Sequence, residues 1–74
     1  MILEQITEAE LKETVRTIVK CGTHEKAGEV LHLTRDGVMG RVRTIRKRYN
    51  INPLRMVRMN VLTDEGEAWL NESP

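Results

Sequence analysis

Residues 34–49 are the segment that most constrains what this chain can fold into, because they are both amphipathic and strongly basic. Apolar side chains recur there at i, i+4, i+7 and i+11, and in a helix that turns about 100° per residue these positions form one narrow stripe. The stripe consists of Val38, Val42, Ile45 and Tyr49. The opposite face carries Asp36, Met39, Gly40, Arg43 and Lys47. The pattern predicts a helix that packs against a core on one side and meets an anion on the other.

Charge is unevenly distributed along the chain, although the net charge is only +1. Residues 1–33 carry six acidic and four basic side chains, whereas residues 35–58 carry eight basic side chains and one acidic one, Asp36. Four further acidic residues follow after Thr63. A basic segment between acidic flanks is typical of a nearly neutral domain with one basic face, and such a face is the electrostatic footprint of nucleic-acid binding.

Length and composition indicate one small domain. A chain of 74 residues has room for a modest core only, so we expect residues 1–74 to form a single domain. The single cysteine, Cys21, excludes an internal disulfide and is typical of a reducing compartment. Neither a secretory signal nor a membrane-spanning apolar segment is predicted, so we expect a cytoplasmic protein without a membrane partner.

Capping residues divide the first half of the chain into helices. Thr7 and Glu10 form a capping box, which predicts a first helix over about 8–20. Gly22 ends that helix, and Thr23 caps a second helix over about 24–31, whose inward residues we expect to be Ala27, Val30 and Leu31. After a minimal connector, Thr34 caps the basic helix over about 35–49. Two short helices joined by such a turn form a helix-turn-helix, and its second helix is the one that enters the major groove.

The second half of the chain predicts a wing and a closing helix. Residues 55–62 alternate in polarity as short extended segments do, although no Asn-Gly or Asp-Gly turn is present to define a hairpin. Thr63 then begins a last helix over about 64–71, in which Ala68, Trp69 and Leu70 are expected to fold back on the core. We therefore expect a mainly α fold, a three-helix helix-turn-helix core with a small β wing and a short C-terminal helix.

Together these segments resemble the amino-terminal winged helix-turn-helix domain of LysR-type transcription regulators. The residues that carry the resemblance are Lys26-Ala27-Gly28-Glu29-Val30-Leu31, then Thr34, Val38, Val42, Ile45 and Tyr49, and finally Leu62-Thr63-Asp64-Glu65-Gly66-Glu67-Ala68-Trp69-Leu70. The chain departs from the family where Arg35-Asp36-Gly37-Val38-Met39 replaces its Gln-Pro-Ala-Val-Ser run, so base preference is not carried over. With no linker helix or effector domain, we expect a stand-alone relative. Residues 22–46 also resemble the Fis-type helix-turn-helix.

The candidate DNA contacts come from the basic helix and the wing. Arginine pairs bidentately with guanine, aspartate accepts from cytosine N4, and methionine touches the thymine methyl group. On this basis the predicted base contacts are Arg35, Asp36, Met39 and Arg43. The predicted contacts to the DNA backbone are Thr34, Arg41, Arg46, Lys47, Arg48, Arg55 and Arg58. The competing interpretation is a solvated helix face, since exposed lysines and arginines are routine.

Two other patterns require separate interpretations. The run Gly37-Val38-Met39-Gly40 fits either close backbone approach to a phosphate or the Gly-x-x-Gly loop of a KH RNA-binding domain. The histidines, His24 and His32, together with Cys21 lack the spacing of a zinc site, so ordinary packing or surface roles are favoured. No serine precedes Ser73, no phosphate-binding loop is present, and the glutamates lie at capping or exposed helix positions rather than in a cleft, so nothing indicates catalysis. We therefore expect no metal, no cofactor and no enzymatic activity.

The sequence thus predicts sequence-specific binding of double-stranded DNA and a role in transcription regulation, with the recognition helix in the major groove. A homodimer is expected, because two-fold pairing doubles the short site that one helix reads. Candidate dimer surfaces are Ile2, Leu3, Ile6 and the tail helix with Trp69, which alternatively cover the core. The rival hypothesis is a winged-helix interaction module that docks on an acidic partner such as the transcription machinery.

Overall fold

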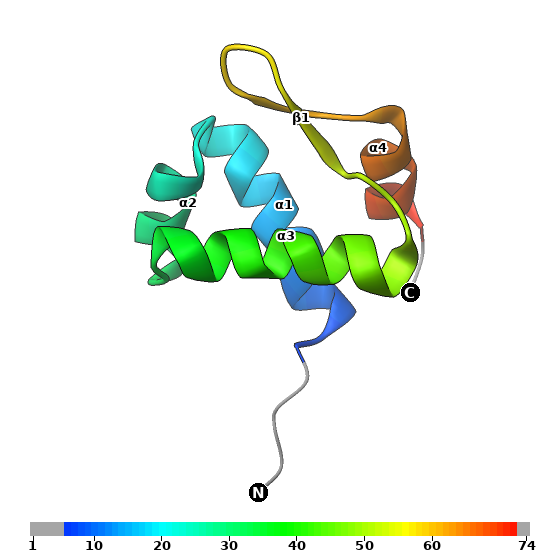
Figure 1. Ribbon diagram of the computed structural model, residues 1–74, viewed down its shortest axis with the longest axis horizontal. Helices are drawn as coiled ribbons and strands as arrows, with labels where there is room; N and C mark the ends of the chain where they lie inside the picture. The colour runs from blue at the N-terminus through cyan, green and yellow to red at the C-terminus, as the bar shows by residue number, and fades with distance from the viewer. Residues whose placement is uncertain (1–5, 73–74) are drawn as a thin grey trace, which may run out of the picture.

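Residues 6–72 fold as four helices and one small sheet. The structure is a computed structural model and describes residues 6–72 (Figure 1). Its elements are α1 (Glu8–Cys21), α2 (His24–Leu31), α3 (Arg35–Tyr49), β1 (Leu54–Met56), β2 (Asn60–Leu62) and α4 (Asp64–Asn71). This mainly helical architecture with a two-stranded antiparallel sheet is the winged helix that the sequence predicted. Ile2 and Leu3, two of the candidate dimer residues, lie outside the described residues.

A threonine begins each of the four helices. In every case its hydroxyl oxygen accepts a hydrogen bond from the amide three residues later, which satisfies one of the free donors at the helix start. The pairs are Thr7 with Glu10, Thr23 with Lys26, Thr34 with Gly37, and Thr63 with Gly66. The first three helices each end at a residue in the left-handed region, namely Gly22, His32 and Asn50. The chain therefore turns where these local signals lie.

The core lies between α1, α2 and α3 and is closed by the wing base and α4. Figure 1 shows α3 running across the front of α1. The buried apolar residues are Leu11, Val15, Ile18, Ala27, Val38, Val42, Ile45, Leu54, Trp69 and Leu70. The apolar stripe of α3 is thus buried as predicted, with Tyr49 half-buried at 5.2 Å from the Trp69 ring. Because Trp69 is 4% exposed, the structure favours its role as core cover over that of a dimer surface.

Two inward assignments were wrong. Val30 is 61% exposed, because α2 buries the arc that contains Ala27 and Gly28 and leaves Val30 to one side of it. Ala68 is also exposed, since α4 buries Gly66, Trp69 and Leu70, and the position of Ala68 lies on the opposite side of that helix.

Two helical glycines allow parts of the backbone to approach closely. A Cβ atom at Gly28 would lie 2.6 Å from the carbonyl oxygen of Leu33, in the turn between α2 and α3. A Cβ atom at Gly66 would overlap the carbonyl oxygen of Pro53, just before β1. Any larger residue at either position would have to move backbone atoms, so the glycines determine how tightly the helix-turn-helix and the α4 junction close.

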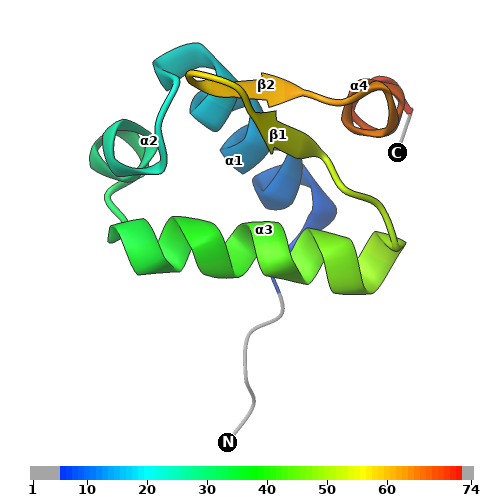
Figure 2. The same ribbon diagram turned by 45° about the horizontal axis from the view of Figure 1, so that its top comes forward.

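The wing begins one residue earlier than predicted, and a tertiary contact holds it in place. In the sheet, Leu54 pairs with Leu62 and Met56 with Asn60. Asn60 is 4% exposed, and its backbone amide and its side-chain Nδ2 both donate to the carbonyl oxygen of Gly22, at 2.9 and 3.1 Å. Figure 2 shows the loop between the strands beside the turn that joins α1 to α2. This contact supplies an anchor in place of the hairpin turn that the sequence lacks.

Candidate nucleic-acid interface

The face of α3 opposite the core stripe is open to solvent. Arg35, Asp36 and Arg43, three of the four predicted base contacts, are exposed, and the fourth, Met39, is half-buried. Lys47 is exposed on the same side. Neither Arg43 nor Lys47 makes a side-chain hydrogen bond or ion pair with any residue in the range 6–72. The helix therefore presents cations with no internal partner in this range and a polar surface for a ligand.

The cations on the flank of α3 that faces the start of α1 are held internally. Arg41 is half-buried, and its Nη1 donates to Thr14 Oγ1 at 3.0 Å, while its Nη2 lies 4.0 Å from a Glu10 carboxylate oxygen. Arg48 Nη1 donates to the carbonyl oxygen of Ile6 at 2.8 Å. These two predicted DNA-backbone contacts therefore join α3 to the first turns of α1 and the residues before it.

Four other predicted backbone contacts differ in how free they are. Arg46 is exposed, and its Nε donates to Asn52 Oδ1 at 3.3 Å. Thr34 Oγ1 accepts from the Gly37 amide at 3.0 Å, so only its hydroxyl hydrogen is left to reach a phosphate. Arg55 is exposed on β1, and its guanidinium makes no hydrogen bond or ion pair in the described part of the chain. Arg58 lies exposed in the loop of the wing.

His24 lies close to the basic helix, which the sequence analysis missed. It is the first residue of α2 and is half-buried. Burial, and next the nearby guanidinium groups of Arg35 and Arg46, hold the pKa of His24 below its ordinary value of 6.5. The start of α2 therefore lies within electrostatic reach of the flank of α3 that carries these two arginines. The sequence signal that could have found His24 is its position directly after Thr23, the residue that caps α2.

The tip of the wing is apolar as well as basic, which the sequence analysis did not single out. Met56, Val57 and Met59 are 62%, 65% and 54% exposed, and Arg58 lies among them. Exposed apolar residues that occur singly are normal, but three within four residues form a patch that suits a partner surface.

The Gly-x-x-Gly run is part of a helix. Gly37 and Gly40 lie within α3, and the described residues form a two-stranded sheet. The KH interpretation requires this run as a loop beside a three-stranded sheet, so it is wrong here. A Cβ atom at Gly40 would meet no other atom within 4 Å.

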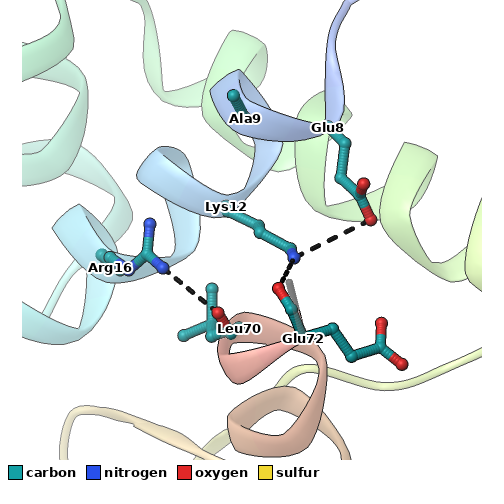
Figure 3. Close-up of a pocket in the computed structure, with 6 residues that line it drawn as sticks. All are labelled: Glu8, Ala9, Lys12, Arg16, Leu70 and Glu72. Atoms are coloured by element: carbon teal, nitrogen blue, oxygen red, sulfur yellow. Dashed lines mark hydrogen bonds and ion pairs between the residues drawn. The ribbon is translucent and has the colours of Figure 1, made fainter. Parts of the chain in front are cut away.

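A pocket between α1 and α4 has a structural role. Its volume is about 230 Å³, and Figure 3 shows basic side chains of α1 pointing to the end of α4. Lys12 Nζ donates to the carbonyl oxygen of Glu72 at 3.1 Å, and Arg16 Nη2 donates to that of Leu70 at 3.2 Å. These bonds satisfy carbonyl groups at the C-terminal end of α4, where cations are favoured. The pocket therefore strengthens the attachment of α4 to α1.

Residues 6–72 contain no group of three or more His, Cys, Asp or Glu side chains arranged to hold a metal ion. Nor does any helix among them combine the length and the apolar character that crossing a membrane requires.

Comparison with known proteins agrees with the fold. No protein-family model and no curated protein matches the chain. Among solved structures, the chain is similar to CrgA, a LysR-type transcriptional regulator from Neisseria meningitidis, with a TM-score of 0.64 and 26% sequence identity. The similarity covers 88% of this chain but only 22% of that regulator. The chain is therefore a winged helix-turn-helix domain that resembles the LysR-type transcriptional regulators.

Proposed function

We propose that this chain binds double-stranded DNA with sequence specificity, with α3 in the major groove, and that it acts in transcription regulation. The observation that carries the proposal is the pair of exposed cations Arg43 and Lys47, which lie on the face of α3 opposite its buried stripe. They make no hydrogen bond or ion pair with another described residue. A solvated helix face accounts for exposure, but the same segment carries eight basic side chains and one acidic one.

Exposure and internal hydrogen bonds divide the predicted contacts into two groups. Those available to DNA are Arg35, Asp36, Met39, Arg43, Lys47, Arg55 and Arg58, with Thr34 available through its hydroxyl hydrogen and Arg46 once it leaves Asn52. In the proposal, the wing arginines contact the sugar-phosphate backbone beside the groove that α3 enters. Arg41 and Arg48 serve first to position α3, because binding a phosphate would require them to give up internal hydrogen bonds.

Titration of a labelled random duplex at about 50 and 200 mM salt, followed by fluorescence anisotropy, tests DNA binding. Arg43→Gln and Lys47→Gln are expected to weaken binding, and loss of the Lys47 phosphate contact makes the negative slope of log K against log salt shallower by about 0.9. Lys20→Gln is the matched control, because it removes the same charge from an exposed position of α1 whose side chain makes no hydrogen bond or ion pair with another described residue. An equal loss in the control, or no binding at low salt, would refute DNA binding.

The proposed active form is a homodimer, because one helix reads few base pairs and two-fold pairing doubles the site. Selection of bound sequences from random DNA tests this point. A palindromic product with half-sites about one helical turn apart is expected, and a single non-repeated motif would contradict it.

The exposed apolar wing tip favours a second candidate function, docking on an acidic protein partner such as the transcription machinery. Replacing Met56, Val57 and Met59 by serine separates the two functions. The docking role is supported if the variant no longer captures the partner while its affinity for short DNA duplexes falls by no more than the loss of wing contacts accounts for. Unchanged capture would refute it.

A further inference from the structure

One glycine of the recognition helix is not required by the fold. Gly22 has φ +87°, and Gly28 and Gly66 each lie where a Cβ atom would strike backbone. Gly37 lies in the first turn of α3, where its Cβ atom would come within 3.3 Å of the capping oxygen of Thr34. Gly40 differs from all of them, because it is in the body of α3 and a Cβ atom there would meet nothing within 4 Å. Glycine inside a helix makes the helix less stable than alanine does, and at position 40 no packing contact in the fold requires glycine.

Gly40 lies at the centre of the face that the proposed function assigns to DNA. Residues 36, 40, 43 and 47 repeat the i, i+4, i+7, i+11 spacing of the buried stripe at 38, 42, 45 and 49, about half a turn away. The neighbours of Gly40 on this face are therefore Asp36, one turn before it, and Arg43, one turn after it, both exposed. Because Gly40 has no side chain, the helix backbone between these two residues is not covered by a side chain of its own.

We propose that Gly40 determines how closely α3 approaches DNA, and so is a specificity-determining residue. Its bare backbone lets base edges in the groove come into van der Waals contact with the helix. Only at that distance do the side chains on either side, from Asp36 and Arg43, reach the donors and acceptors of the bases. This inference rests on the proposed function and adds to it a steric condition that charge alone does not supply.

A size series at position 40 tests the inference, because it separates the stability of the fold from its affinity for DNA. Gly40→Ala is expected to raise the melting temperature by about 4–8 °C, since the fold has room for the methyl group and the helix gains propensity. The same variant is expected to bind the selected duplex roughly tenfold more weakly, and Gly40→Leu more weakly still, as for groups forced into a packed contact. The loss of affinity for a random duplex is expected to be smaller than the loss for the selected duplex.

Ala68→Leu is the matched control, because it enlarges an exposed side chain on α4, away from the proposed interface. A Gly40→Ala variant that binds the selected duplex as tightly as the parent chain would overturn the inference, and so would one that melts at a lower temperature. The proposed function would survive either result if Arg43→Gln still weakened binding. If the parent chain bound no DNA even at low salt, the proposed function itself would fall.

Discussion

The substitution Gly28→Ala is expected to destabilise the protein, although helix propensity alone predicts the opposite. Gly28 lies inside α2, where alanine would gain about 1 kcal/mol of intrinsic stability. The added Cβ atom, however, would lie 2.6 Å from the carbonyl oxygen of Leu33 and 3.5 Å from the carbonyl carbon of Thr34. These are backbone atoms of the turn before α3, so the contact cannot be relieved by rotating a side chain.

The magnitude follows from the two opposed effects. Forcing a methyl group into a packed site costs about 1–3 kcal/mol. A value near the upper end applies, because moving the turn also strains the 2.8 Å hydrogen bond from the Leu33 amide to the Gly28 carbonyl oxygen. After subtraction of the propensity gain, the free energy of unfolding is expected to fall by about 1–2 kcal/mol. The melting temperature then falls by about 4–8 °C per kcal/mol in a domain of this size.

Thermal unfolding followed by circular dichroism, together with urea titration, measures this change. Gly40→Ala is the internal control, because both variants replace a helical glycine by the same residue but only one meets a neighbouring atom. The two are expected to shift the melting temperature in opposite directions. If Gly28→Ala proved as stable as the parent chain, or more stable, the steric reasoning about the turn would be wrong.

Three further predictions concern the wing anchor, a titrating histidine and the α4 junction. Asn60→Ala removes the Nδ2 donor to the Gly22 carbonyl oxygen, so stability should fall by about 1 kcal/mol and a protease should cut the wing faster. Burial and nearby cations lower the pKa of His24 in the folded chain, so as the pH falls the unfolded chain binds a proton at this residue before the folded chain does. The free energy of unfolding should therefore fall as the pH drops below 6.5, and His24→Gln should flatten the dependence of the urea midpoint on pH. Glu8→Ala removes the acceptor of the Trp69 indole N–H at 3.2 Å, so it should cost about 1–3 kcal/mol and shift the tryptophan emission to the red; unchanged emission would contradict this.

Much of the fold could be predicted from the sequence because its signals are local. The caps Thr23 and Thr34 act on amides three residues away, and the stripe of α3 depends on positions within the same helix. Segregation of charge is equally visible without coordinates, since it needs only the order of residues. The winged-helix class and the basic face of α3 could therefore be predicted from the sequence alone.

Tertiary structure decided which residues of that face are free to act. Arg41 and Arg43 are both arginines of the same basic helix. Arg41 is hydrogen-bonded to Thr14, 27 residues away in the chain, whereas Arg43 has no hydrogen-bond or ion-pair partner among the described residues. Likewise Gly28 and Gly40 carry the same propensity cost, and only a contact between backbone segments distinguishes them. The physical reason is that periodicity reports neighbours a few residues apart, while hydrogen bonding, burial and clearance depend on segments that meet only when the chain has folded.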